Sequence, residues 1–290
     1  MPGFSAKEFL SDCNEHFVII LGTNEIASAV AARLTWERRR VVLSHDAHPP
    51  VIRRGMAFHD ALYGDRAEVD GVVADLTQTT LDVVDVLSRP GRVAVSPLPL
   101  TDLITLRAPD VLIDARMQKH RVTPDLRGIA GLVIGMGPNF TAGWNCDVAI
   151  ETHPAHTGEL LENGATLPSD GVARVLGGVG KERFIYAARD GVWRTPLDIG
   201  ARVFRDYLLG RLDGLPIQAP MDGFLRGIAR DGVHAALGVK LVEIDPRGRA
   251  SNWTGTDERG RAIAEAVVRA IAQSPARGGR RPSRGKVTLH

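Results

Sequence analysis

The first 150 residues alternate between short apolar runs and segments with helical spacing. Phe17–Leu21 is an apolar run that ends at Gly22, which is typical of a buried strand in a parallel sheet. Apolar and alanine residues then recur at helical spacing over residues 25–38, and Arg40–Ser44 predicts a second strand. A strand, a glycine turn, a helix and a strand form the opening of a Rossmann-type unit.

The same alternation continues toward residue 150. A strand is expected over residues 69–76 and a helix over residues 79–87, which stops before Pro90-Gly91. Further short strands are expected at residues 93–96, 111–114 and 132–134. The pattern predicts an α/β domain over residues 1–150, with a mostly parallel sheet and helices on both faces.

The character of the chain changes after residue 150. Glycines and short β-like runs dominate residues 151–250, and an internal repeat appears at an offset of thirty-two residues. The matched positions are residues 190–194 with 222–226, Gly200 with Gly232, Leu209 with Leu241, Leu212 with Ile244, and Asp213 with Asp245. Two similar β-units in tandem predict a pseudo-twofold sandwich, because each half alone exposes one apolar face. A barrel-sandwich hybrid, the fold of lipoyl and biotinyl carriers, has this symmetry.

The region after residue 250 predicts a closing helix and a basic tail. The helix is expected at residues 257–273, within a C-terminal segment of residues 251–273. After it, residues 274–290 carry five basic residues and no acid, which is the composition of a disordered, solvated tail.

Composition narrows the class of protein. With 290 residues, 44% of them apolar and 24% charged, the chain is long enough for two packed domains. A formal net charge of +2 gives no reason to expect nucleic acid as a partner. Two cysteines exclude a disulfide framework, and no apolar run approaches the length of a membrane span. The N-terminal segment has no apolar signal core, so a cytoplasmic location is expected.

The turn at Gly22 is a partial dinucleotide fingerprint. In a G-x-G-x-x-G/A pattern, Gly22 and Ala27 fit the first and third positions, but Asn24 stands at the second. A side chain at that position obstructs the approach of a pyrophosphate, and Glu25 adds a negative charge. Asp46 follows Gly22 at a suitable distance to hold a ribose hydroxyl. A Rossmann scaffold that binds something else there, or nothing, is the alternative.

Two further segments suit an anionic ligand. Arg53 and Arg54 follow the second strand, and guanidinium groups there suit phosphate or carboxylate, although a solvated surface pair would look the same. Residues 135–143 form a loop dense in glycine and small residues, which can expose backbone N–H groups as an anion nest or be a plain turn. Its candidate contacts are Gly135, Gly137, Asn139, Thr141 and Gly143.

A cluster of polar residues follows that loop. Its members are Cys146, Asp147, Glu151, Thr152, His153 and His156. The residue types invite a metal site, but Pro154 disfavours a helix that would place the two histidines on one face, so no metal is expected. Acid–base or ligand contacts and purely structural roles remain open, and Glu151 and His156 are kept as candidate cofactor contacts. Cys146 would be reactive only if its thiol pKa were lowered.

At these segments the chain resembles the YqeB-type accessory proteins of the selenium-dependent molybdenum hydroxylase system, which are discussed beside the XdhC/CoxF maturation factors. The matching segments are residues 51–63, 109–119, 132–152 and 219–248, and the resemblance runs from about residue 17 to residue 272. The elements Gly-x-Gly-Pro-x-Phe-x-Ala-Gly and Asp-Pro-Arg-Gly are the most specific. The resemblance implies a Rossmann-like domain, a barrel-sandwich part and a role in molybdoenzyme maturation.

The chain departs from this family at two segments. The family's first turn looks like Gly-x-Gly-Asp-Leu-Ala-Thr-Gly, whereas this chain has Asn24, Glu25 and Ala29 at three of those positions. The family's Glu-Thr-x-Arg-Gly-His segment keeps its histidine as His156 but loses the arginine. The junction of the two β-units, residues 213–217, has no lysine, so neither biotin nor lipoate is expected there.

Three functions remain open from the sequence. The first is an accessory or maturation protein for a molybdenum hydroxylase or related oxidoreductase, binding a client enzyme and a nucleotide or molybdopterin-type cofactor through Arg53, Arg54 and residues 135–143. The second is an NAD(P)-dependent oxidoreductase with its cofactor at Gly22 and Asp46, against which Asn24 argues. The third is a non-catalytic structural subunit of an enzyme complex, and a homo-oligomer is also open.

Overall fold

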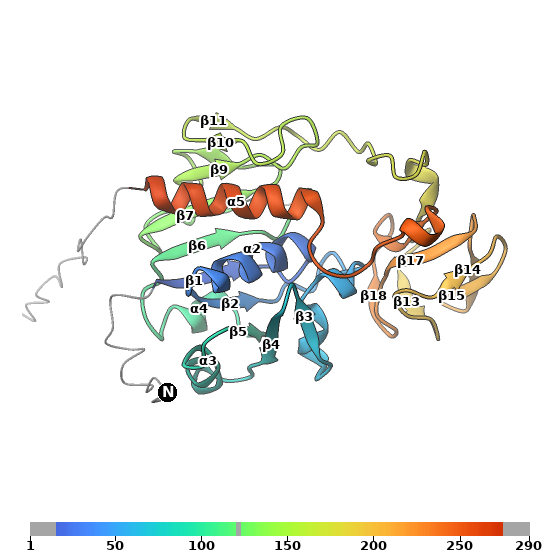
Figure 1. Ribbon diagram of the computed structural model, residues 1–290, viewed down its shortest axis with the longest axis horizontal. Coiled ribbons are helices and arrows are strands. Elements are labelled where there is room, and N and C mark those ends of the chain that lie inside the picture. Colours follow the sequence, from blue (N-terminus) through green and yellow to red (C-terminus); the bar gives the residue numbers. More distant parts are fainter. Residues whose placement is uncertain (1–15, 120–122, 275–290) are drawn as a thin grey trace, which may run out of the picture.

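A computed structural model describes residues 16–119 and 123–274 of the chain. It consists of an α/β part, built around one large sheet, and a β-rich part formed by residues 184–245 (Figure 1). The expected basic tail at residues 274–290 lies, apart from Ser274, outside the described residues.

The α/β part contains a nine-stranded sheet within the described ranges. Its order is β10-β9-β7-β6-β1-β2-β5-β4-β3. All neighbours from β4 to β9 pair in parallel, and the edge strands β3 and β10 are antiparallel. The bounds are β1 Phe17–Leu21, β2 Arg40–Ser44, β3 Ala67–Val69, β4 Val72–Leu76, β5 Arg92–Ser96, β6 Val111–Asp114, β7 Leu132–Met136, β9 Val148–Ile150 and β10 Leu160–Leu161. This mostly parallel sheet is consistent with the Rossmann-like expectation.

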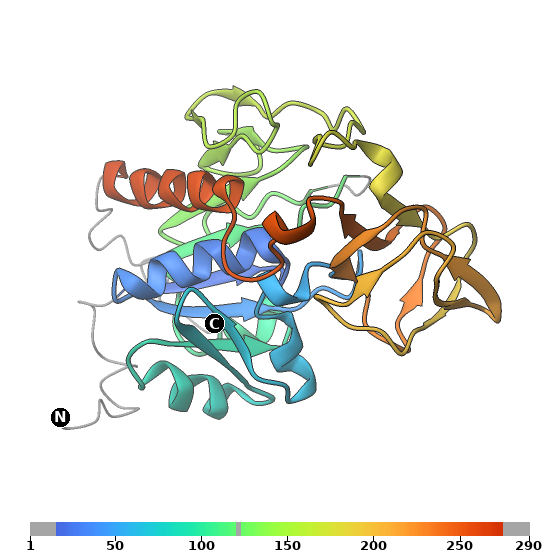
Figure 2. The ribbon, with the colours of Figure 1, turned by 45° about the vertical axis from the view of Figure 1, so that its right-hand side comes forward.

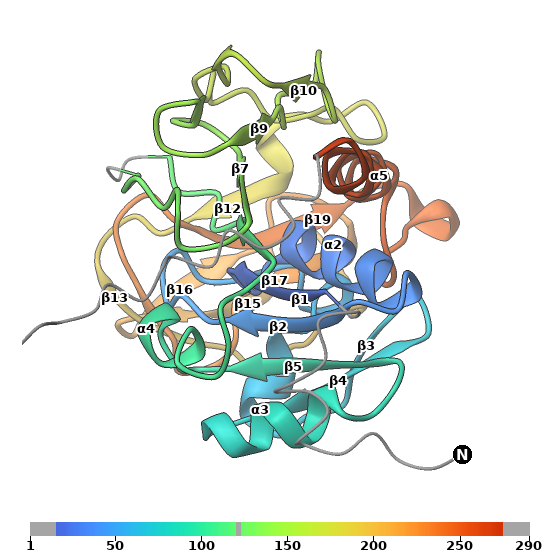
Figure 3. The same cartoon turned by 90° about the vertical axis from the view of Figure 1, so that its left-hand side faces the viewer.

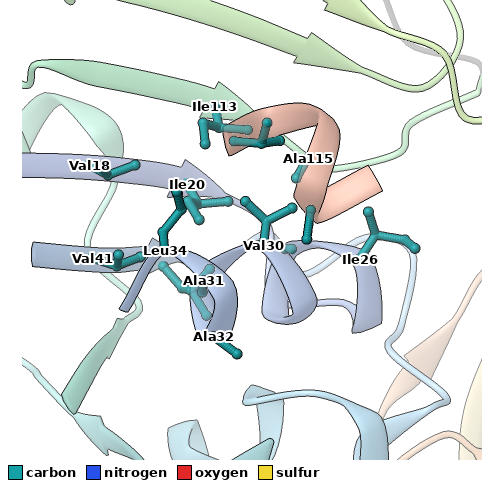
Figure 4. Close-up of a cluster of buried hydrophobic side chains, with 14 of the residues drawn as sticks. Val18, Ile20, Ile26, Val30, Ala31, Ala32, Leu34, Val41, Ile113 and Ala115 are labelled. Atoms are coloured by element: carbon teal, nitrogen blue, oxygen red, sulfur yellow. The ribbon is translucent and has the colours of Figure 1, made fainter. Parts of the chain in front are cut away.

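Helices cover both faces of the sheet, and side chains of β1 alternate between two cores. On one face, Val18 and Ile20 pack with α2 (Glu25–Trp36) and α5 (Glu258–Gln273), and Figure 4 shows Val30 and Leu34 of α2 directed toward these strand residues. On the other face lie α3 (Thr80–Leu87) and α4 (Leu100–Leu103). Both faces are apolar because a parallel sheet covered by helices buries each of its faces.

The expected helices form close to their predicted bounds. Helix α2 ends two residues earlier than expected, because Glu37 caps it and Arg38 turns into a left-handed conformation with φ of 58°. Helix α3 begins at a capping box in which the Thr79 side chain accepts from the Asp82 N–H. Asp257 caps α5 in the same manner, since its carboxylate accepts from the Gly260 N–H at 2.8 Å.

The strand predicted over residues 69–76 forms only in part, as β4 at residues 72–76. The structure has an antiparallel hairpin there, in which β3 and β4 are joined at Asp70-Gly71. Both turn residues have positive φ angles, 49° and 79°. An Asp-Gly pair is the usual sequence of a two-residue hairpin turn, and here it interrupts an otherwise apolar run.

The α/β part extends beyond the boundary predicted at residue 150. Strand β10 joins the edge of the large sheet, and β11 (Gly164–Ala165) pairs with β8 (Thr141–Ala142). Helix α5 also belongs to this part, since it packs along α2, as Figures 1 and 3 show. The β-rich part is therefore inserted between two segments that complete the α/β core.

The β-rich part consists, in the described residues, of two four-stranded sheets, β12-β19-β17-β14 and β16-β15-β13-β18. The bounds are β12 Phe184–Tyr186, β13 Gly191–Arg194, β14 Arg202–Val203, β15 Leu208–Leu212, β16 Leu215–Gln218, β17 Gly223–Ile228, β18 His234–Ala235 and β19 Lys240–Asp245. All pairings are antiparallel.

The two halves of the β-rich part repeat each other. Strands β13, β14 and β15 begin thirty-two residues before β17, β18 and β19 respectively, which is the offset found in the sequence. The pairings correspond as well, since β13 pairs with β15 and β18 just as β17 pairs with β19 and β14. Each sheet thus receives strands from both halves, and both halves share one core around Trp193.

The described chain also contains short 3-10 turns, and a long connection leads from the α/β part to the β-rich part. Arg54–Met56 and His59–Tyr63 form 3-10 turns after β2, and a further turn, Lys181–Arg183, precedes β12. Figure 2 shows the segment from β11 to β12 running from the α/β part across to the β-rich part. In the described part of the chain, no helix is both long enough and apolar enough to cross a membrane.

Candidate functional site

A cavity of about 550 Å³ lies where the two parts and their connection meet. Its wall comes from Arg53, from residues 167–176 of the connection, from β12, β17 and β19, and from the start of α5. Among the described residues, nine basic ones line it against five carboxylates. The basic residues are Arg53, Lys119, Arg174, Arg183, Arg226, Lys240, Arg247, Arg259 and Arg261. This excess of positive charge is the main chemical feature of the cavity.

Glu243 of β19 is the buried anion at the base of this site. Its side chain is fully buried, and Arg53 Nε lies 2.6 Å from one carboxylate oxygen. Arg183 binds the other oxygen, and the Nε atom of Arg226 lies 3.6 Å from it. Burial alone would raise the pKa of the Glu243 carboxyl, but the three guanidinium groups hold that pKa below its ordinary value.

The arginines around Glu243 have outer partners. Arg53 also pairs with Glu25 at the start of α2, at 3.1 Å. Arg226 pairs with Asp257, the cap of α5, at 3.0 Å. Arg183 has its Nε atom buried without a partner in the described residues. Burial lowers the pKa of both Arg183 and Arg226, which means that their positive charges are incompletely compensated.

Arg259 is a cation of this site without a carboxylate partner among the described residues. Its Nη2 atom donates to the Thr152 carbonyl at 2.9 Å, and its Nε atom is buried and unpaired. Burial lowers the pKa of its guanidinium. Arg259 is half-buried, and a buried Nε donor is costly to leave unpaired, so the position favours an anionic group as its partner.

The predicted pair of arginines is divided by the structure. Arg53 lines the cavity, whereas Arg54 does not. Arg54 is buried and donates to the Ile228 carbonyl at 2.9 Å, to Asp60 at 2.6 Å and to Asp198 at 2.5 Å. Because Ile228 and Asp198 belong to the β-rich part, Arg54 links that part to the α/β part. Neither arginine is the solvated surface residue that was one interpretation of the pair.

In the Gly22 turn, the side chain of Asn24 binds the backbone groups that a ligand would otherwise contact. Asn24 Oδ1 accepts from the N–H groups of Ile26 and Ala27, both at 3.0 Å, and Asn24 Nδ2 donates to the Ala115 carbonyl at 2.7 Å. A Cβ atom at Gly22 would lie 3.0 Å from that same carbonyl oxygen. The donors that would receive a pyrophosphate at a helix N-terminus are therefore occupied by Asn24.

Asp46, His48 and His59 lie near the same edge of the sheet as the Gly22 turn. Asp46 accepts from Gln118 Nε2 at 2.7 Å and from the His48 N–H at 3.0 Å. Thr23 Oγ1 contacts the Nδ1 atom of His59 at 3.0 Å. Burial lowers the pKa of His59 to about 3, so this ring is neutral near pH 7 and adds no positive charge for a phosphate.

The loop at residues 135–143 is explained by packing. A Cβ atom at Gly135 would lie 2.0 Å from the Phe140 ring, and one at Gly137 would lie 3.0 Å from the Met117 sulfur. The Thr141 N–H is bound by Asn145, whose Nδ2 atom also donates to the Asn139 carbonyl at 2.9 Å. The Gly143 N–H donates to the Cys146 carbonyl. The loop reaches the cavity through Pro138.

Replacing Gly135 with Ala is expected to destabilise the protein by about 1–3 kcal/mol, because the new methyl group overlaps the Phe140 ring. Denaturant unfolding measures this change. Gly143→Ala is the matched control, since no atom lies within 4 Å of the place its new methyl group would take and only the positive φ of 79° opposes it. In a Gly135→Ala, Phe140→Leu double variant the two costs should not add. Simple additivity would contradict the packing explanation.

The Cys-Asp-Glu-His cluster is spread over separate local contacts. Glu151 lines the cavity, but its carboxylate accepts from the N–H groups of Thr152, His153 and Leu167. His153 pairs with Asp170 at 3.0 Å, and the half-exposed His156 pairs with Glu159 at 3.1 Å. No group of three or more potential metal ligands occurs within the described ranges.

Cys146 is buried in the core beneath the sheet, among residues that include Phe140 and Ala149. Burial raises the pKa of its thiol to about 12. A thiol with this pKa is almost entirely protonated at neutral pH, so the structure gives no support to a reactive thiol at this position.

The cavity residues include several that the sequence patterns did not indicate. Arg183, Arg226, Lys240 and Glu243 lie on three strands or turns of the β-rich part, and Arg259 lies on α5. Their spacing along the chain follows no motif. One feature of the sequence could have indicated them: charged residues stand within segments that otherwise have the apolar pattern of buried strands.

None of the family models compared matches the chain. The chain is similar to the uncharacterized protein YqeB of Escherichia coli (strain K12), with 31% identity over 255 residues. The match covers 88% of this chain and 47% of that protein, so the chain spans about half the length of the curated relative it matches. The similarity supports the YqeB-type resemblance of the sequence. The name of that relative describes no activity, ligand or partner.

Proposed function

We propose that this protein is an accessory protein that binds an anionic cofactor or nucleotide in the cavity between its two parts. The observation that carries the proposal is Arg259, a half-buried arginine whose Nε donor is buried and unpaired, beside a cluster whose positive charges exceed its carboxylates. An anion in the cavity would satisfy these donors and offset the excess charge. A volume of about 550 Å³ suits a small molecule rather than a polymer.

The proposed ligand is a nucleotide or a molybdopterin-type cofactor, and the proposed partner is a client oxidoreductase. The role in maturing a molybdenum hydroxylase comes from the resemblance of the sequence to the YqeB-type accessory proteins. The alternative of a nicotinamide cofactor at the Gly22 turn is disfavoured, because Asn24 uses the backbone donors that a pyrophosphate requires.

We infer that the β-rich part is a barrel-sandwich hybrid of lipoyl and biotinyl type. The support is its pseudo-twofold arrangement. Strand β14 of the first half pairs with β17 of the second half in one sheet, and the equivalent strand β18 pairs with β13 in the other sheet. In carriers of this fold the modified lysine lies at the hairpin between the halves. Here that hairpin turns at Asp213-Gly214 and has no lysine, so the proposal includes neither biotin nor lipoate.

Anion binding at the cavity is expected to depend on Arg259. A thermal-shift screen with NAD(H), NADP(H), ATP, CTP, GTP and molybdopterin-type nucleotides identifies a ligand, since saturation at a hundred times the Kd stabilises by about 2.7 kcal/mol. Arg259→Gln should then weaken binding of that ligand by about tenfold or more, because it removes a charge-assisted hydrogen bond. Isothermal titration calorimetry measures the change in Kd.

Arg269→Gln is the matched control for this experiment. Arg269 lies on the same helix, and its Nη2 atom also donates to a backbone carbonyl, that of Gly158 at 3.0 Å, but it does not line the cavity. Its replacement should leave the Kd unchanged. Equal binding by wild type and Arg259→Gln would refute the cavity as the site, and so would the absence of any shift across the whole screen.

A further inference from the structure

Lys240, the first residue of β19, is an amine of the cavity whose ammonium group lies over an aromatic ring. Its Nζ atom lies 4.0 Å from the centroid of the Phe184 ring. Within the described residues the ammonium has neither an ion pair nor a hydrogen bond, although Lys240 lines a wall that contains five carboxylates. A surface lysine would be solvated, whereas this one is half-buried.

The charges around Lys240 oppose its protonation. Burial is the largest cause, and the positive charges of Arg53 and Lys119 act in the same direction. Glu243 and Glu25 act in the opposite direction, but their carboxylates are already paired with arginines. Together these effects lower the pKa of the Lys240 ammonium to about 8. Near pH 8 about half of the Lys240 side chains therefore carry a free lone pair, compared with less than about 1% for an ordinary lysine.

We propose that Lys240 is a nucleophile that forms an imine with the carbonyl group of an anionic ligand held in the cavity. This inference rests on the proposed function and deepens it, because it assigns a chemical class to the ligand: an aldehyde or ketone that also carries a phosphate or carboxylate. The anionic group would contact the arginines of the cavity, and its binding would place the carbonyl group beside the amine.

The reaction balances without an oxidant or a reductant. The deprotonated Lys240 nitrogen donates its lone pair to the carbonyl carbon, and the carbonyl π electrons move to oxygen. Proton transfer from nitrogen to oxygen through water gives a carbinolamine. Loss of one water molecule, made of the former carbonyl oxygen and two hydrogens, leaves the C=N bond. Cationic side chains around the site favour the anionic ligand, and a buried lysine of lowered pKa is the usual form of an imine-forming amine.

The sequence provides internal reference lysines. The chain has five lysines, Lys7, Lys119, Lys181, Lys240 and Lys286, of which Lys7 and Lys286 lie outside the described residues. Lys119 also lines the cavity but is exposed, and Lys181 is exposed outside it, with its Nζ atom 5.6 Å from the Tyr186 ring. The rate at which a carbonyl reagent labels Lys240 can therefore be compared, within one protein, with its rates at an exposed lysine inside the cavity and at one outside it.

The test uses pyridoxal 5′-phosphate as a probe, followed by reduction with borohydride and peptide mapping by mass spectrometry. At pH 8 the full-length wild-type protein should be labelled at Lys240 at least about tenfold faster than at Lys119 or Lys181, because a larger fraction of Lys240 is unprotonated. The rate at Lys240 should rise with a midpoint near pH 8. Pyridoxal without phosphate should show a smaller preference for Lys240, because it lacks the anionic group that the arginines of the cavity would bind.

Two variants and a non-carbonyl analogue separate the inference from the function on which it rests. Lys240→Arg keeps the positive charge and should abolish the fast labelling, whereas Lys181→Arg should leave it unchanged. Pyridoxine 5′-phosphate, which has the phosphate but no aldehyde, should protect Lys240 from labelling. If the analogue binds and Lys240 is labelled no faster than the exposed lysines, the imine is overturned while anion binding stands. If the analogue does not bind either, both the imine and the proposed site are wrong for this class of anion.

Discussion

Truncation of the chain after Thr256, which removes α5, is expected to abolish folding. Six buried side chains of this helix complete the core over α2 and the sheet. They are Ile263, Ala264, Ala266, Val267, Ala270 and Ile271. The two helices approach closely, since a Cβ atom at Gly260 would lie 3.1 Å from the Ala29 Cβ. Without α5 the apolar face of α2 would be exposed to water, which a domain of this size cannot compensate.

The control for this experiment is a chain that ends at Ser274. It retains every described contact of α5 and should show the unfolding temperature of the full-length protein by circular dichroism. A single substitution gives a graded version of the same test, because Ile263→Ala should cost about 2–5 kcal/mol. A cooperative unfolding transition in the chain lacking α5 would show that the helix is an appendage rather than part of the core.

The elements that depend on local pattern could be predicted from the sequence. Apolar runs such as Phe17–Leu21 and Arg40–Ser44 became the parallel strands expected of them, and α3 and α5 begin at capping residues that are visible in the sequence. The thirty-two-residue repeat also predicted which strands of the β-rich part are equivalent. In each case the information lies within a short window of the chain or in a comparison of two windows.

The features that depend on contacts between distant residues could not be predicted. Nothing in the sequence around Arg54 indicates that its partners are Asp198 and Ile228, which lie more than a hundred residues later. Gly135 looked like part of an anion-binding loop, but its constraint is the Phe140 ring packed against it. A glycine that makes room for a side chain and one that admits a ligand have the same appearance in a sequence.

The candidate site shows the same limitation. Arg53 was found because it follows a strand at the carboxyl end of the sheet, where α/β proteins bind ligands. Arg183, Arg226, Glu243 and Arg259 surround it only because the β-rich part and α5 fold back against that end. Charge clusters of this kind are assembled by the packing of domains, and the spacing of their residues along the chain does not predict them.

Replacing Glu243 with Gln is expected to destabilise the protein by about 3–5 kcal/mol, because it removes the negative charge from the centre of three arginines while their desolvation remains. Arg183 should be affected most, since Arg53 and Arg226 keep Glu25 and Asp257 as partners. The free energy of unfolding in urea measures the loss. Glu265→Gln is the matched control, because this half-exposed carboxylate pairs with Arg33 at the surface and should contribute less than about 1 kcal/mol.

Anions should partly rescue the Glu243→Gln variant. If the cavity accepts a ligand because its cations outnumber its carboxylates, removal of one more carboxylate increases that imbalance, and phosphate should bind the variant more tightly than wild type. Phosphate should then raise the unfolding temperature of the variant more than that of wild type or of Glu265→Gln at equal ionic strength. A loss of stability without this selective rescue would mean that Glu243 holds the two parts together but that the cations around it are not open to a ligand.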